Sequence, residues 1–137
     1  MVLENKLNLT SSAELAKMEE MLSKKKAIEL FESGHLENLE AGKFSSLAAI
    51  HEFLFAEIYD FAGQVRDVNI AKGNFRFAPT IFLADTLKTI DNLPENTFDE
   101  IIKKYVEMNV AHPFREGNGR ATRIWLDQIL KKNWVSV

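Results

Sequence analysis

The stretch His112-Pro-Phe-Arg-Glu-Gly-Asn-Gly-Arg-Ala-Thr-Arg123 places a titratable base, a carboxylate, a glycine-rich turn and two arginines close together in the chain. The turn Gly117-Asn118-Gly119 lets several backbone N–H groups converge on one anion, because glycine reaches conformations that a β-carbon forbids. The run that starts at Arg120 is typical of a helix, so the turn lies at a helix N-terminus, where free N–H groups and the dipole favour phosphate oxygens. Both features predict a phosphate site.

The charged side chains of this stretch fit the same prediction. Arg120 and Arg123 lie on the first turn of the expected helix, and guanidinium groups match phosphate oxygens bidentately. Glu116 would repel a phosphate unless a cation lay between them, so we expect Mg²⁺ to bridge the carboxylate and the phosphate. The ordinary pKa of a histidine, about 6.5, suits His112 to removing a proton from a hydroxyl near neutral pH.

Each of these residues also has an ordinary explanation when it is taken alone. A histidine before a proline is more often structural than catalytic, Gly-Asn-Gly is a common turn, and two arginines can form a solvated helix face. Each of these explanations accounts for one residue or pair and leaves the presence of the others to coincidence. The combination therefore favours a functional site. The sequence excludes a Walker loop, since no Gly-Lys-Ser/Thr follows the turn, and His112 with Glu116 is not a zincin pair.

The stretch resembles the signature His-x-Phe-x-(Asp/Glu)-Gly-Asn-Gly-Arg-x-x-Arg of the Fic (filamentation induced by cAMP) family, and every defining position is filled. The resemblance implies a protein adenylyltransferase of the compact single-domain class. Such an enzyme transfers AMP from ATP to a Ser, Thr or Tyr hydroxyl of a target protein and releases pyrophosphate. Positioning and charge neutralisation would then do most of the catalytic work.

The resemblance also implies a role for each motif residue. His112 would be the general base, and Glu116 would hold Mg²⁺ at the α- and β-phosphates. Arg123 would reach the γ-phosphate, and Phe114 would anchor the loop in the core. The residues expected to bind the phosphates of ATP are Gly117, Asn118, Gly119, Arg120 and Arg123.

A second stretch supports the resemblance. Residues 65–70 and 75–78 are short extended runs around Ala71-Lys72-Gly73-Asn74, which predicts a β-hairpin with glycine in its turn. A plain surface hairpin is the ordinary interpretation, but the segment at about 65–78 resembles the flap of Fic proteins. In that family the flap covers the nucleotide and offers a strand edge to the target. The flap residues expected to dock the target are Lys72, Gly73, Arg76 and Phe77.

The rest of the sequence predicts a helical scaffold, so we expect a mainly α fold, a Fic-type helical bundle with one β-hairpin flap. Ser11 and Glu14 form a capping-box pattern for the first helix, and apolar residues recur at helical spacing in the later ones. His51 lies beside such an apolar stripe and is expected to be packed or hydrogen-bonded. The helices before the motif are expected at about 11–33, 44–61 and 79–93, and from about 97 into the motif.

Composition narrows the class of protein. A chain of 137 residues with 46% hydrophobic content predicts one domain, 1–137, with a buried core. The net charge of −3 argues against a direct nucleic-acid partner. No apolar stretch is long enough to span a bilayer and the N-terminus lacks the apolar core of a signal peptide, so we expect a cytoplasmic protein with no membrane partner. The absence of cysteine fits a reducing compartment where ATP is available.

The sequence departs from the resemblance at its C-terminus. Fic cores usually carry further helices after the motif helix, so we expect the C-terminal part of the family core to be missing here. Many Fic proteins also carry an inhibitory helix with a Ser/Thr-x-x-x-Glu-Gly/Asn motif, which is C-terminal in the compact class and is expected to be lacking. Ser33-Gly-His-Leu-Glu37-Asn38 fits the pattern literally, but Gly34 marks a helix end, so we interpret it as a chance match.

Alternatives to AMP transfer stay open at the level of sequence. Related family members transfer phosphate, UMP or phosphocholine, and a catalytically inactive nucleotide-binding or interaction module is also compatible with the motif. The target is not named by the sequence. Family analogy implies a toxin-like protein whose targets include bacterial topoisomerase subunits, together with self-modification and homo-oligomers.

Overall fold

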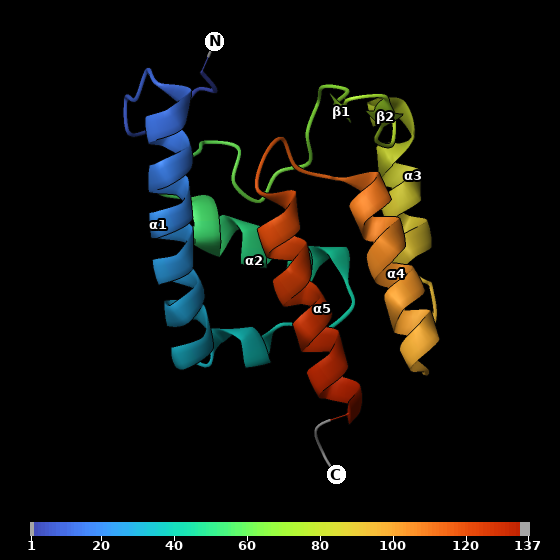
Figure 1. The fold of residues 1–137 in the computed structure, drawn as a ribbon. Coiled ribbons are helices and arrows are strands. Elements are labelled where there is room, and N and C mark those ends of the chain that lie inside the picture. The colour runs from blue at the N-terminus through green and yellow to red at the C-terminus, as the bar shows by residue number, and fades with distance from the viewer. Residues whose placement is uncertain (1, 135–137) are drawn as a thin grey trace.

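The computed structural model describes residues 2–134 of the chain. These residues contain five α-helices and one short β-hairpin, joined by loops and a 3₁₀ helix (Figure 1). The predicted fold class, mainly α with one hairpin, is confirmed. In chain order the elements are α1 (Ser12–Glu32), the 3₁₀ helix η1 (His35–Asn38), α2 (Phe44–Phe55), β1 (Ala71–Lys72), β2 (Phe75–Arg76), α3 (Thr80–Asp91), α4 (Phe98–Ala111) and α5 (Asn118–Trp134).

The centre of the bundle is α5, which begins within the motif at Asn118, two residues earlier than the expected start at Arg120. In Figure 1, α5 lies between α1 and α4, and α2 crosses behind it; α5 packs on both α2 and α4. Trp125 of α5 is fully buried, and its indole N–H donates to the carbonyl oxygen of Lys43 at 3.0 Å, just before α2 begins. The start of α5 is therefore fixed by the core, at the end of the molecule where the hairpin lies.

Local capping explains where the helices begin and end. The Ser11 hydroxyl accepts the N–H of Glu14 at 3.3 Å, and α1 ends before Gly34, whose φ of +76° suits glycine. A complete capping box between Thr97 and Glu100 starts α4. These signals lie in the local sequence, which is why α1, α3 and α4 fall within two residues of their predicted limits.

The predicted second helix, 44–61, is too long. It ends at Phe55, and Ile58 and Tyr59 reach the core from turns, with 0% and 1% of their surface exposed. Two hydrogen bonds with residues outside the helix accompany the end of α2. Lys6 donates its backbone N–H to the carbonyl oxygen of Ile58 at 2.7 Å, and Gly63 donates its N–H to His51 Nδ1 at 2.9 Å.

The hairpin lies at its predicted place but has shorter strands than expected. Ala71 pairs with Arg76 and Lys72 with Phe75 in an antiparallel register. At the end of the preceding extended run the carbonyl oxygen of Ile70 accepts the N–H of Phe77 at 3.2 Å, but earlier polar groups of the run bond outside the hairpin. The backbone N–H of Arg66 donates to Pro113 at 2.8 Å, and Asn69 Oδ1 accepts the N–H of Thr80 at 2.9 Å.

The segment that matches the inhibitory pattern lies far along α5 from the motif. Ser33 caps the end of α1, and the exposed Glu37 belongs to the 3₁₀ helix η1. The side-chain amide of Gln128 donates to the carbonyl oxygens of Leu36 and Leu39 at 2.9 and 3.0 Å. This anchoring to the C-terminal half of α5 directs Glu37 away from the predicted phosphate site.

Candidate functional site

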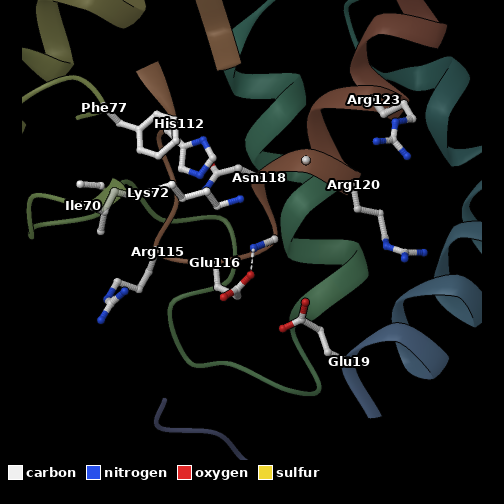
Figure 2. Close-up of a pocket in the computed structure, with 13 residues that line it drawn as sticks. Glu19, Ile70, Lys72, Phe77, His112, Arg115, Glu116, Asn118, Arg120 and Arg123 are labelled. Atoms are coloured by element: carbon white, nitrogen blue, oxygen red, sulfur yellow. Dashed lines mark hydrogen bonds between the residues drawn. The ribbon is translucent and has the colours of Figure 1, made fainter. Parts of the chain in front are cut away.

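A pocket of about 410 Å³ gathers most of the residues predicted for the site (Figure 2). The structure brings the motif together there with Lys72 and Phe77 of the hairpin. Gly73 and Arg76 do not line the pocket and are exposed, and Phe114 is fully buried beneath it. The lining residues are Glu19, Ile70, Ala71, Lys72, Phe77, His112, Arg115, Glu116, Gly117, Asn118, Gly119, Arg120 and Arg123.

The end of α4 determines which nitrogen of His112 is available. Pro113 has no N–H, so it cannot donate to the carbonyl oxygen of Asn109 as a continuing helix would. Nδ1 of His112 lies 3.2 Å from that oxygen. Because a carbonyl oxygen only accepts, Nδ1 carries the proton, and the lone pair of a neutral ring is on Nε2. His112 adopts φ +50°, an uncommon conformation for a residue other than glycine.

The hairpin covers one face of this imidazole. The rings of Phe77 and His112 stack with centroids 3.8 Å apart and planes 12° from parallel, and Figure 2 shows Phe77 over His112. Burial lowers the pKa of His112 from its ordinary value, and the charges of Lys72 and Arg66 lower it further. The ring is therefore neutral at neutral pH and can accept a proton.

The two glycines of the turn differ in what a β-carbon would meet. Gly117 has φ +81°, and a β-carbon there would lie 2.6 Å from the ring of Phe55. At Gly119 a β-carbon would meet no atom within 4 Å, so this glycine leaves open space above the N-terminus of α5. An anion can enter that space and meet the free N–H groups of the first helical turn.

A buried histidine supports the turn from below. The N–H of Gly63 donates to Nδ1 of His51, so the opposite nitrogen carries the proton and donates to the carbonyl oxygen of Glu116 at 2.7 Å. The His51 ring stacks on Phe114 with centroids 3.9 Å apart. Burial lowers the pKa of His51 to about 4, which keeps it neutral. The expectation that His51 is packed and hydrogen-bonded is confirmed.

The side chain of Asn118 closes the loop rather than facing the pocket. Its Oδ1 accepts the N–H of Phe114 at 2.9 Å, and its Nδ2 donates to the carbonyl oxygen of Phe114 at 2.7 Å. Both ends of the amide are committed to these bonds, and Asn118 is 3% exposed. The residue thus lines the pocket as expected, but it has its backbone, not its side chain, to offer an anion.

Sequence reasoning missed Glu19, which lies on α1 and lines the same pocket. Its carboxylate accepts a hydrogen bond from the hydroxyl of Tyr59. Burial raises the pKa of Glu19, as does the nearby charge of Glu116. A weak signal was present, since Glu19 follows the buried Leu15 by one helical turn and so occupies a core-facing position. The exposed Arg115, also missed, lines the pocket from the motif loop.

The acidic residues of the pocket fit a cation that arrives with a phosphate ligand. Within residues 2–134 no group of three or more metal-binding side chains gathers, so a cage made by the protein alone is not found. One oxygen of Glu116 accepts the N–H of Gly117 at 3.1 Å, which leaves the other free. Mg²⁺ is commonly held by one or two carboxylates together with substrate phosphates, and Glu116 is suited to be such a ligand.

Comparison with known proteins identifies the family. The model of the Fic/DOC family matches residues 43–130. The chain belongs to the Fic/DOC family. It is 29% identical over 142 residues to the "Probable protein adenylyltransferase y4lH" of Sinorhizobium fredii, with 95% of this chain and 71% of that protein covered. It is 32% identical over 138 residues to the "Protein adenylyltransferase VbhT" of Bartonella schoenbuchensis, with 91% of this chain but 28% of the relative covered.

Solved structures agree with the Fic fold. The "Type IV secretion system effector protein BepA" superposes with a TM-score of 0.82 at 23% identity, covering 96% of this chain and 52% of BepA. The Fic chain thus spans about half the length of this structural neighbour and a smaller part of VbhT. In residues 2–134 none of the helices combines the length and apolar character needed to cross a membrane.

Proposed function

We propose that this Fic protein transfers AMP from ATP to a hydroxyl group of a target protein and releases pyrophosphate. The observation that carries the proposal is the neutral His112, which lines one pocket together with the glycine turn, Arg120 and Arg123. The relatives' names support the nucleotide, because both are called protein adenylyltransferases.

In the proposed reaction His112 acts as the general base. Nε2 takes the proton from the target hydroxyl while its oxygen forms a bond to the α-phosphorus of ATP. The bond from that phosphorus to the bridging oxygen breaks, and pyrophosphate leaves with the electron pair. The hydrogen bond from Nδ1 to Asn109 keeps the ring oriented and stabilises the positive charge that it gains.

Besides activating the hydroxyl, the site must neutralise the negative charge of ATP. Backbone N–H groups of Asn118 and Gly119 and the dipole of α5 would bind phosphate oxygens, and Arg120 and Arg123 project from the first turns of the same helix (Figure 2). Mg²⁺ held by Glu116 would neutralise part of the charge on the phosphates. Since the backbone donors of the turn are fixed before the ligand arrives, they need little reorganisation.

The hairpin is the proposed docking place for the target. Its two strands are exposed and pair only with each other within the described residues, so each leaves an outer edge to which a segment of another protein can add. A target strand placed there would run past Lys72 and Phe77, beside His112. Docking through backbone groups requires little of the target sequence apart from the hydroxyl itself.

The test is transfer of label from ATP to protein in the presence of Mg²⁺. Label on the α-phosphate should appear on the chain itself or on proteins of a lysate and should disappear in His112→Ala. His35→Ala is the matched control, because His35 is exposed on η1 outside the pocket, and it should transfer at the wild-type rate.

Other outcomes select among the alternatives. Transfer of label from the γ-phosphate would show phosphate transfer, and activity with labelled UTP or CDP-choline instead of ATP would show a different donor. An ATP-dependent rise in melting temperature without transfer of any of these groups would contradict the enzymatic proposal and identify a nucleotide-binding module.

A further inference from the structure

Arg66 is a buried cation that bonds four carbonyl oxygens, although its sequence context gives no sign of this. It is 5% exposed. Nε donates to His112 at 2.6 Å and Nη1 to Val68 at 2.7 Å. Nη2 donates to Ala78 at 2.6 Å and to Ala111 at 3.0 Å. The guanidinium group therefore joins the end of α4 to both ends of the flap.

The partners of Arg66 explain how a charge can be buried there. Among residues 2–134 no carboxylate lies within ion-pair distance of Arg66. The last carbonyl oxygens of a helix carry a partial negative charge and have no partner in the helix. Arg66 supplies that partner for Ala111 and for the capping residue His112. The structure thus places the guanidinium where a helix C-terminus favours a cation.

The same bonds set the relative position of the flap and the base. Val68 and Ala78 lie on either side of the hairpin, and between them Phe77 stacks on His112. A further bond, from the N–H of Ala78 to the carbonyl oxygen of Val110 at 3.1 Å, joins the flap to α4. A shift of the guanidinium would therefore move Phe77 and the backbone of His112 relative to one another.

We propose that Arg66 is a positioning residue that holds the flap, and with it a docked target hydroxyl, in register with His112. This inference rests on the proposed AMP transfer and adds a residue outside the motif to it. Misplacement of reacting groups by about 1 Å can lower a rate by about 100-fold. Loss of Arg66 should therefore lower the rate of transfer without removing any group that contacts ATP.

ATP binding should be independent of Arg66 because the phosphate-binding turn has its own supports. His51 holds the carbonyl oxygen of Glu116, and Asn118 bonds both backbone groups of Phe114. Arg66 bonds neither the turn nor α5. The expected signature is thus a fall in kcat with an almost unchanged KM for ATP. Because a smaller folded fraction would also lower the apparent kcat, the rates are compared per folded molecule, well below each melting temperature.

The experiment compares Arg66→Lys and Arg66→Met with Lys104→Met. Lys104 is a matched control, since it is a buried cation, 2% exposed, that donates to the carbonyl oxygens of Asp91 and Leu93 and to Glu95 away from the pocket. We expect kcat to fall about 100-fold in Arg66→Met, with an intermediate value in Arg66→Lys, which keeps a charge but has fewer donors. Lys104→Met should lower the melting temperature and retain kcat when assayed well below it.

Two results would overturn the inference. One is a wild-type kcat in Arg66→Lys and Arg66→Met. The other is an equal loss of kcat and of ATP-dependent thermal stabilisation in the Arg66 variants. Should Arg66→Met not fold, Arg66→Lys alone decides between these outcomes.

A second measurement separates this inference from the proposed activity. If the wild-type chain transfers no AMP, the proposed function fails, but hydrogen exchange still tests the position of the flap. In Arg66→Lys the N–H groups of Phe77 and Ala78, which bond Ile70 and Val110, should exchange at least tenfold faster, whereas that of Ala121, which bonds Gly117, should be unchanged. Unchanged exchange at Phe77 and Ala78 would contradict the positioning role.

Discussion

The turn that is proposed to bind phosphates and the flap that covers His112 meet in one pocket but are held in different ways. The turn is fixed from below by the buried side chains of His51 and Asn118. The flap is exposed, its strands contain two residues each, and its ends depend on Arg66. In the proposed reaction, phosphate binding would therefore be preorganised, whereas the position of the target would depend on a few contacts that can be altered separately.

The largest expected effect comes from breaking the turn at Gly117. In Gly117→Ala the β-carbon would lie 2.6 Å from the Phe55 ring at φ +81°, so we expect a loss of about 2–4 kcal/mol in the free energy of unfolding. ATP should then no longer raise the melting temperature. Gly119→Ala is the control for stability, because its β-carbon meets open space.

Gly119→Ala should keep the stability of the wild type but bind ATP more weakly, since its β-carbon would lie in the open space where the proposed reaction requires the anion. Urea unfolding and thermal shifts with ATP and Mg²⁺ measure both properties. Equal stability of the two variants would contradict the packing argument at Gly117.

A smaller effect is expected when acid weakens the support of the turn. The unfolded chain protonates His51 near its ordinary pKa of 6.5, whereas the folded protein resists protonation until about pH 4. The contribution of His51 to stability is therefore complete above pH 6.5 and decreases as the pH falls from 6.5 to about 4. The loss amounts to roughly 3 kcal/mol.

Urea unfolding between pH 7 and pH 4 measures this dependence, and comparison with His51→Gln separates it from the titration of carboxylates. An NMR titration of the wild-type ring should give a midpoint near 4. A midpoint near 6.5, or the same pH dependence in both proteins, would show that the turn is not held by a neutral His51.

The smallest effect is expected from the flap. Phe77→Ala removes the ring that stacks on His112, a contact of about 1 kcal/mol, so kcat should fall about fivefold while ATP still stabilises the protein to the same extent. Phe82→Ala is the matched control, because Phe82 is an aromatic residue of α3 that is 57% exposed and does not line the pocket. If both variants lose activity equally, the stack on His112 is not the cause.

The parts that could be predicted from sequence are those encoded locally. The motif places its base, carboxylate, glycines and arginines within a few turns of chain, so their convergence needed no knowledge of distant contacts. The capping box at Thr97 likewise lies next to the helix that it starts. Lys72 and Phe77 of the hairpin were expected through the resemblance to the Fic flap. Two residues from other parts of the chain gave little or no signal. Glu19 reaches the pocket from α1, and in the sequence Arg66 cannot be told from an ordinary charged residue of a loop.

The error in the second helix has the same physical origin. The apolar spacing that predicts a helix continues to Phe61, because Ile58 and Tyr59 are buried as deeply as residues of α2. Periodicity reports which residues are buried but not which backbone groups pair. The bonds that end the helix come from Lys6 and Gly63, and neither can be inferred from the pattern of apolar residues.

Pro113, which follows His112, determines which ring nitrogen of His112 can react with a chemical reagent. A reagent that acylates or alkylates imidazole needs a lone pair, and the proton on Nδ1 is held by the Asn109 carbonyl oxygen that Pro113 leaves free. Modification should therefore give a single isomer, substituted at Nε2. A covalent inhibitor of this protein can be designed for one nitrogen and one direction of approach, from the pocket side.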